Sequence, residues 1–116
     1  MKPLTKIQES ARGEYCTVDL VGCRMDTETT VLAHYTAQVL GSTRKHDLRA
    51  CYACVECHDR LDDRTKYPWK QYEKQARWQY AISKTHVKLL EKGLIKIAGD
   101  EDQIHTTTTY KVLPRR

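Results

Sequence analysis

Four of the five cysteines have the residue type and the spacing of a metal site. Cys54 and Cys57 form a C-x-x-C pair, and two thiolates at that spacing can hold one tetrahedral ion from a tight turn. Cys16 and Cys23 lie upstream and can supply two more ligands, because Gly22 helps the loop between them to close. Four soft thiolates select zinc and leave the ion no open position. The sequence therefore predicts a structural zinc site.

Other interpretations of the cysteines have less support. Their number is odd and the chain starts with charge rather than an apolar export signal, which argues against a disulfide scaffold. A redox C-x-x-C would need a strand-helix-strand context that this sequence lacks. Buried free thiols remain the simplest alternative. Cys51 is left over, and we expect it to fill a small space in the core.

Two histidines and several carboxylates surround the cysteine pair. His34 ends a β-branched segment, Asp47 begins the next short apolar segment, and His58 directly follows Cys57. The expected order of strand, loop, strand and helix resembles the ββα-metal arrangement of HNH nucleases. In that arrangement the first histidine is the general base that takes a proton from water, so that hydroxide attacks phosphorus. The histidine on the helix holds a divalent ion, Mg²⁺ or Mn²⁺, which stabilises the departing oxygen.

The ligand set of that catalytic ion is incomplete on this reading. Many HNH enzymes have an acidic residue or a histidine before the base, where this chain has Ala33. Asp62 lies four residues after His58, so the two side chains share one helical face. Asp59 points about 100° away and is expected at the surface. Asp47 and Asp62 are therefore the expected partners, either as ligands of the ion or as groups that orient a histidine.

Simpler roles are open for each histidine. His34 can be a strand histidine bonded to a backbone carbonyl. His58 can be a neighbour of the cysteine pair, or a zinc ligand in place of one cysteine. His46 lies in a loop and can be exposed. His86 and His105 have no chemical partners around them in the sequence, so we expect them to be structural or solvent-facing.

The residues around these positions resemble one small family, the YbcO-like nucleases that prophages of the lambdoid type encode. The similarity covers about residues 8–97 and implies a zinc-stapled ββα-metal fold, nuclease activity in phage recombination or DNA processing, and a location in the cytoplasm of a bacterial host. Five segments carry it: Ser10-Ala11-Arg12-Gly13-Glu14-x-Cys16, Glu28-Thr29-x-Val31-Leu32-Ala33-His34, Asp47-Leu48, Ala53-Cys54-x-x-Cys57-His58-Asp59-x-x-Asp62-x-Arg64-Thr65, and Leu89-x-x-x-Gly93-x-Ile95-Lys96.

Short strands and helices must position these residues. Pro68 and Gly93 mark the ends of a long helix, expected over 69–92. Its predicted buried face has helical spacing and consists of Tyr72, Ala76, Tyr80, Val87, Leu90 and Leu94, widened by Trp69, Ile82 and Leu89. Elsewhere β-branched and apolar runs and turn residues predict strands at 14–18, 29–35 and 48–52, a helix at 55–64, a short helical or irregular lead-in at 1–13, and loops at 19–28 and 38–46.

Length and composition fit one small α+β domain. The chain has 116 residues, of which 40% are hydrophobic and 30% charged, and no apolar run is long enough to cross a bilayer. We therefore expect no membrane association and a cytoplasmic protein. The HNH-like domain is expected over 1–97. Residues 98–116 form an extension, in which 106–112 is β-prone and can pair with 94–97 as a hairpin.

The net charge of +5 is compatible with an anionic partner. Arg44, Lys45 and the lysine-rich face of the long helix can contact a phosphate backbone, or can simply be solvated. The leading interpretation is a metal-dependent nuclease acting on nucleic acid, with DNA as the expected substrate. One alternative, favoured by Ala33, is an inactive zinc-stapled module that binds nucleic acid. The other is an interaction protein whose long helix docks onto a protein partner, which the sequence leaves unidentified.

Overall fold

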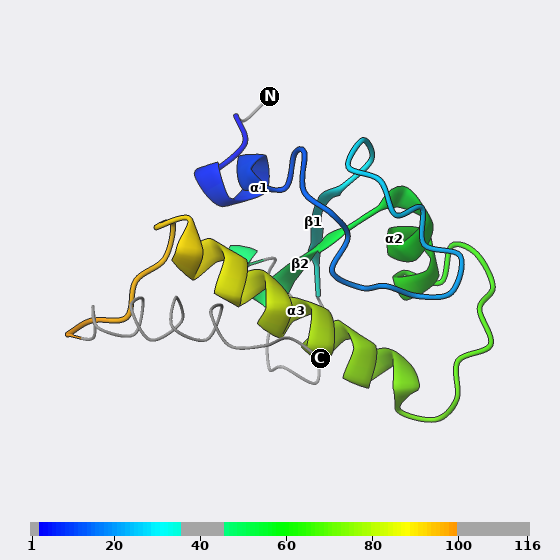
Figure 1. The fold of residues 1–116 in the computed structure, drawn as a ribbon. Helices are drawn as coiled ribbons and strands as arrows, with labels where there is room; N and C mark the ends of the chain where they lie inside the picture. The colour runs from blue at the N-terminus through cyan, green and yellow to red at the C-terminus, as the bar shows by residue number, and fades with distance from the viewer. Residues whose placement is uncertain (1–2, 36–45, 100–116) are drawn as a thin grey trace, which may run out of the picture.

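The computed structural model describes residues 3–35 and 46–99, which build a two-stranded antiparallel sheet with helices around it (Figure 1). In the sheet, His34 lies opposite Ala50 and Val31 lies opposite Ala53. The predicted α+β class and the long helix after the sheet are thus confirmed. In chain order the elements are α1 (Lys6–Ser10), β1 (Val31–His34), the 3-10 turn η2 (Asp47–Arg49), β2 (Ala50–Ala53), α2 (Val55–Leu61) and α3 (Glu73–Glu91).

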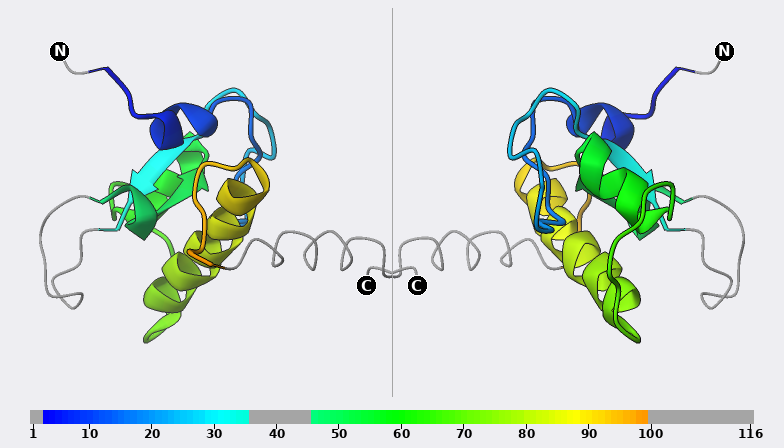
Figure 2. Two further views of the ribbon diagram at one scale, coloured as in Figure 1. Left: turned by 90° about the vertical axis from the view of Figure 1, so that its left-hand side faces the viewer. Right: turned by 90° about the vertical axis from the view of Figure 1, so that its right-hand side faces the viewer.

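Alternating side chains of the two strands feed two apolar cores. The first core joins Ala33, Cys51 and Ala53 to the cysteine-rich region, α2 and the first half of α3. The second joins Leu32 and Tyr52 to α1 and the last turns of α3. Accordingly, α2 lies near the beginning of α3 and α1 near its end (Figure 1), and in both views of Figure 2 the yellow end of α3 is the end closer to α1. Both cores depend on α3, which spans the sheet.

The long helix begins at Glu73, four residues later than predicted. The N-cap residue Tyr72 has a φ of 66°, a left-handed conformation that a right-handed helix cannot continue through. Trp69, predicted as the first helical residue, packs against Tyr67 with ring centroids 4.6 Å apart. Its indole N–H donates to the carbonyl of Arg60 at 3.2 Å. Because Trp69 packs against the end of α2, the helix does not begin directly after Pro68 as the sequence predicted.

The prediction of which α3 residues are buried is largely wrong. Tyr72, Tyr80 and Val87 are exposed, and of the predicted residues only Ile82 and Leu89 are buried. The hydroxyl of Thr85 accepts a hydrogen bond from the backbone N–H of Tyr52 at 3.1 Å, so a polar residue completes the edge of β2. Small residues on this face allow close approach to the strand, and a search for large apolar side chains misses them. The buried residues of α3 are Trp78, Ala81, Ile82, Thr85 and Leu89.

Boundaries in the first half also differ from the predictions. No strand forms over 14–18, because Thr17 reaches β2 alone: its N–H and its hydroxyl both donate to the carbonyl of Tyr52, at 2.8 and 2.9 Å. The left-handed backbone of Asp19, with a φ of 58°, then turns the chain away. The 55–64 helix ends early, before Asp63 with a φ of 59°. The other two strands are confirmed with shifted ends, and 19–28 is irregular as expected.

Some predictions fall on residues outside the described ranges. These are Arg44 and Lys45 in the basic loop, His105, and the 106–112 segment of the expected hairpin. Its other half, 94–97, contains no strand. Within residues 3–35 and 46–99, no helix is long and apolar enough to cross a membrane.

Candidate active site and cysteine cluster

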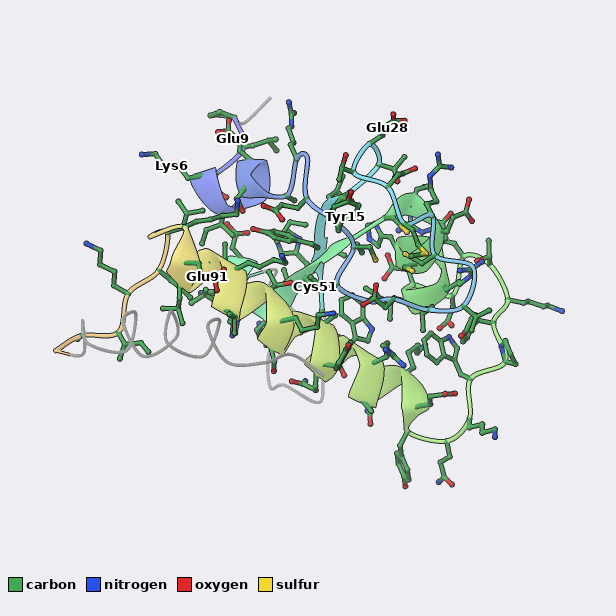
Figure 3. All side chains as sticks on the ribbon, in the orientation of Figure 1. Lys6, Glu9, Tyr15, Glu28, Cys51 and Glu91 are labelled. Carbon is green, nitrogen blue, oxygen red and sulfur yellow. The ribbon has the colours of Figure 1, made fainter. Side chains whose placement is uncertain are left out.

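The four cysteines singled out from the sequence come together where the loop after α1 meets α2. One sulfur from each of Cys16, Cys23, Cys54 and Cys57 lies within 4.8 Å of all the others, and Figure 3 shows sulfur atoms gathered beside α2. The Sγ atoms of Cys23 and Cys54 are 3.8 Å apart. A tetrahedron with metal–sulfur bonds of about 2.3 Å has edges of about 3.8 Å. The four thiols could hold one metal ion, and Cys51 lies outside the group.

Local structure explains how the chain gathers these thiols. Cys54 is the N-cap of α2, and its sulfur accepts from the N–H of Cys57 at 3.5 Å. Arg60 on α2 donates to the carbonyl of Val21 at 3.0 Å, which ties the loop that carries Cys23 to the helix. Glycine suits position 22 at this contact. Its φ is +87°, and a Cβ there would lie 2.7 Å from the Arg60 guanidinium.

Protons are shared unequally within the cluster. A hydrogen bond with Cys57 lowers the pKa of Cys16 to about 5. The same contact, together with burial, raises the pKa of Cys57, and burial raises the pKa of Cys23 to about 11. Cys16 is therefore the thiol that ionises first, while Cys23 and Cys57 resist ionisation. A cation at the centre would remove that resistance, because thiols lose their protons when they bind a metal. Burial also raises the pKa of Cys51, which makes it an inert thiol.

His34, at the end of β1, is held by Asp47 at the start of η2. The Nε2 atom of His34 lies 2.9 Å from Oδ1 of Asp47. Burial alone would raise the pKa of Asp47, but hydrogen bonds from His34 and Thr5 outweigh it and the net pKa lies below its ordinary value. Asp47 is therefore a stable carboxylate. A histidine that donates Nε2–H to a carboxylate keeps Nδ1 as its proton acceptor.

Helix α1 supports this pair through two residues. The hydroxyl of Thr5 donates to Oδ2 of Asp47 at 2.7 Å, and the amide of Gln8 donates to Oδ1 at 3.4 Å. The same residues form the capping box of α1, in which each side chain bonds the backbone of the other. Neither Thr5 nor Gln8 was expected at the site. The T-x-x-Q spacing is a detectable signal for the helix start, but nothing in it points to Asp47.

His58 and Asp62 form a second pair on and just after α2. Nε2 of His58 lies 3.1 Å from Oδ2 of Asp62, so the two residues do share one helical face. Burial lowers the pKa of His58 despite the opposing charge of Asp62. The ring is therefore neutral near pH 7, as a metal ligand must be. The 3.1 Å separation also matches the edge of about 3.0 Å in an octahedron with bonds of about 2.1 Å. The pair thus offers one nitrogen and one oxygen donor, whereas in the described residues only the four cysteines form a group of three or more possible metal ligands.

A guanidinium group lies against both members of this pair. Nη2 of Arg64 is 2.6 Å from Oδ2 of Asp62 and 3.4 Å from Nε2 of His58. Arg64 also approaches Asp59 at 3.6 Å. The side chain of Arg64 is 57% exposed, so it is free to turn into solvent. A cation is thus already in contact with Oδ2 of Asp62 and Nε2 of His58.

His34 and Asp62 share one cavity of about 240 Å³. Lys74 and Trp78 of α3 also line it. We expected the rings of His34 and His58 to face a common cleft. His34 borders this cavity, whereas the described residues that line it include Asp62 but not His58. The structure therefore connects the two pairs through Asp62, and Asp47 lies behind His34 rather than in this cavity.

Comparison with known proteins identifies the family. Residues 5–94 match the family described as "Putative nuclease YbcO". The chain belongs to the YbcO family. It is 35% identical over 96 residues to "Putative nuclease YbcO" of Escherichia coli (strain K12) and to the protein of that name in Enterobacteria phage 82; the match covers 80% of this chain and 99% of each relative.

A solved structure matches the YbcO-family fold described above. It is described as "Structure of a putative bacteriophage protein from Escherichia coli str. K-12 substr. MG1655". The TM-score is 0.62 at 32% identity, over 76% of this chain and 100% of that chain. The region matched by the YbcO family runs from α1 into the last residues described after α3, so it contains the cysteine cluster and both His–Asp pairs.

The other described histidines of this YbcO-family chain have structural contacts. His46 is the N-cap of η2, and its Nδ1 accepts from the N–H of Leu48 at 3.1 Å. Nε2 of His86 lies 2.6 Å from the carbonyl of Leu48 and so donates to it, linking α3 to η2. Both contacts fix the turn that carries Asp47. These histidines therefore act on the candidate site through the backbone.

Proposed function

We propose that this YbcO-family chain is a metal-dependent, HNH-type endonuclease that hydrolyses phosphodiester bonds in DNA, in a phage DNA-processing or recombination context. The observation that carries the proposal is the arrangement of two His–Asp pairs, one of which places a histidine in the same cavity as the carboxylate of the other. The names of the relatives in E. coli and phage 82 support the same reaction class.

His34 is the general base in this proposal. Its Nδ1 accepts a proton from water, and the resulting hydroxide attacks phosphorus. Asp47 holds the ring by its bond to Nε2–H and stabilises the imidazolium that forms. Thr5 and Gln8 fix the carboxylate in turn. The base is thus oriented by a chain of contacts that begins in α1.

His58 and Asp62 would hold the divalent ion, Mg²⁺ or Mn²⁺. When bound, the ion supplies Lewis-acid stabilisation of the charge on the phosphate and the departing oxygen. The neutral ring of His58 and the adjacent carboxylate provide one nitrogen and one oxygen donor. Arg64 must turn away from these donor atoms, because its guanidinium now contacts both.

Zinc is the ion proposed for the cysteine cluster, and its role is structural. Four thiolates leave the ion no open position for water or substrate. It would join the 16–23 segment to the beginning of α2. Because His58 directly follows the ligand Cys57, zinc binding would also fix the position of the second His–Asp pair.

Plasmid nicking in the presence of Mg²⁺, Mn²⁺ or EDTA tests the proposal. We expect nicking with either ion, none with EDTA, and none from His34→Ala, which should still bind DNA and retain its melting temperature. His86→Gln tests the support of the η2 turn separately, since Nε2 of His86 donates to the carbonyl of Leu48 and glutamine keeps a donor. Nicking by His34→Ala at the wild-type rate would refute the assignment of the base.

One observation favours a second candidate, a nucleic-acid-binding module without turnover. Arg64 contacts both proposed ligand atoms, and Ala33 supplies no additional ligand. If the guanidinium holds this position permanently, the chain would bind phosphate but not a divalent ion. DNA binding without nicking in either metal would support this candidate.

A further inference from the structure

A second cavity borders His34 on the side of α1, and the proposed reaction places no part of the substrate in it. This α1 hollow has a volume of about 250 Å³, and its lining includes Leu4, Arg12, Val31 and His34. The cavity lined by Asp62 and by residues of α3 also borders this histidine. His34 is the residue that the two linings share. The candidate base thus borders two hollows, one beside α3 and one beside α1.

The charge of the α1 hollow favours an anion. Its lining contains one arginine and no carboxylate. Arg12 is exposed, and its side chain has no ion pair or hydrogen bond with any residue in 3–35 or 46–99. By contrast, the cation Lys92 already has an anionic partner, because it pairs with Glu14 at 2.6 Å. Arg12 therefore has its guanidinium available for an external anion, and guanidinium binds phosphate in a bidentate geometry.

The remaining wall of the hollow is mixed: Leu4, Val31 and Leu32 are apolar, and Gln8 and Thr30 are polar. Leu4 and Val31 are 45% and 46% exposed, which leaves hydrocarbon surface next to the arginine. A free inorganic anion gains nothing from such a wall, whereas a nucleotide presents a sugar and a base beside its phosphate. The volume is also slightly below the range of about 300–1,000 Å³ for complete small-molecule sites. Two modest hollows that both border one base suit a chain-like substrate better than a small molecule.

We propose that the α1 hollow seats a nucleotide next to the scissile phosphate, with Arg12 bound to the phosphate of that nucleotide. The substrate strand then crosses His34 from one hollow to the other. This inference rests on the proposed nuclease function, because it names the part of the substrate that lies beyond the reacting phosphorus. It also gives a role to Arg12, which belongs to the family-like segment 10–16 and has no part in the His–Asp pairs.

Equilibrium binding of a fluorescein-labelled single-stranded DNA tests the proposal with the full chain and no added Mg²⁺ or Mn²⁺. Arg12→Gln should weaken binding about tenfold at low salt and reduce the slope of log affinity against log salt by about one. Lys6→Gln is the matched control, since it removes the same charge from α1 and Lys6 points away from the body of the protein (Figure 3). It should weaken binding less than about twofold. Arg12→Lys should recover part of the loss.

Equal affinities of the Arg12→Gln and Lys6→Gln variants would overturn the nucleotide seat. Melting temperatures provide the check on folding, and neither substitution should change them because Arg12 has no partner among the described residues. The nicking assay separates the two proposals. Nicking by the wild type with equal binding of the two variants retains the nuclease and rejects the seat. Selective loss of binding by Arg12→Gln, in a wild type that never nicks, retains the seat as a binding site and rejects the nuclease.

Discussion

The two His–Asp pairs have similar distances but different surroundings. In the first pair, Nε2 of His34 lies 2.9 Å from its carboxylate, and in the second, Nε2 of His58 lies 3.1 Å from its own. Both oxygens of Asp47 accept further hydrogen bonds from the beginning of α1. By contrast, the side chain of Asp62 is 35% exposed. Its hydrogen-bond partner Arg64 is 57% exposed and can turn away into solvent. The same pair of residue types is thus built once as a fixed unit and once as an exchangeable one.

This difference supports separate roles for the two carboxylates. Asp47 already accepts three hydrogen bonds, from His34, Thr5 and Gln8, so orientation of the ring is the role that its contacts favour. To bind an ion, Asp62 needs to release only the guanidinium of Arg64, which is itself a cation. A divalent ion can replace that charge without leaving a buried group unpaired. Within the proposed function, the comparison therefore favours the first pair as the base and the second as the metal-binding pair.

The largest expected effect comes from the cysteine cluster, on which the second pair depends more than the first. Structural zinc contributes about 10–16 kcal/mol in small zinc domains, as much as or more than the whole stability of a typical domain, about 5–15 kcal/mol. Cys54→Ser should therefore lose the metal and the cooperative thermal transition. Mass spectrometry should find about one zinc per chain in the wild type.

Cys51→Ala is the matched control for that experiment. Cys51 is fully buried in β2 but lies outside the cluster, so its variant should keep the zinc and unfold cooperatively. Zinc retained by Cys54→Ser, or lost by Cys51→Ala, would mean that the ligand set is wrong.

Exchanging each carboxylate for its amide should separate the two pairs. Asp47→Asn should lower the rate of a single turnover of cleavage by about 10²–10⁴, the range for a general base that loses its partner, while Mn²⁺ affinity changes little. Asp62→Asn should instead weaken Mn²⁺ binding by about 10–100-fold. Calorimetric titration with Mn²⁺ and rapid-quench cleavage measure the two effects. Equal losses of Mn²⁺ affinity in both variants would remove the distinction between the pairs.

Removing the guanidinium from the second pair should have a smaller effect, in the opposite direction. Arg64→Ala leaves His58 and Asp62 without their present cation, so Mn²⁺ affinity should rise by up to about fivefold, the worth of an exposed ion pair. Arg24 forms a similar pair with the carboxylate two residues away, at 3.0 Å, so Arg24→Ala is the matched control. Weaker Mn²⁺ binding by Arg64→Ala would show that the arginine helps the ion rather than competes with it.

Features that depend on ligand chemistry or on one helix were predictable from the sequence. Thiolates at metal spacing have few other uses, so the cysteine cluster follows from Cys16, Cys23 and the C-x-x-C pair without knowledge of the fold. The contact between His58 and Asp62 follows from a four-residue spacing. In both cases the information lies in residue type and in a short separation along the chain.

Features that depend on distant segments were not predictable. The partners of Asp47 on α1 lie 42 and 39 residues away in the sequence. The buried face of α3 depends on Thr85, which completes the edge of β2 33 residues away. A threonine on a helix ordinarily indicates a solvent-facing position. Its burial here follows from the unpaired N–H that β2 presents, and only the packed structure reveals that donor.

The smallest expected effect is a difference in the pH range over which each pair affects stability. The pKa of His58 lies below its ordinary value of 6.5, chiefly because the ring is buried. The unfolded chain therefore binds a proton more readily, and the contribution of His58 to folding is present above pH 6.5 and declines as the pH falls below it. Asp47 also has a lowered pKa, from an ordinary value of 3.8, so its contribution declines only below about pH 4.

Urea unfolding without added divalent ions measures this difference between the pairs. The wild type should show a decrease in the free energy of unfolding below pH 6.5, where the unfolded chain takes up the proton that the buried ring of His58 resists. His58→Gln should remove that decrease, whereas Asp47→Asn should leave it in place and alter only the behaviour near pH 4. A decrease below pH 6.5 that persists in His58→Gln would mean that another group titrates there and that the second pair does not hold a neutral histidine.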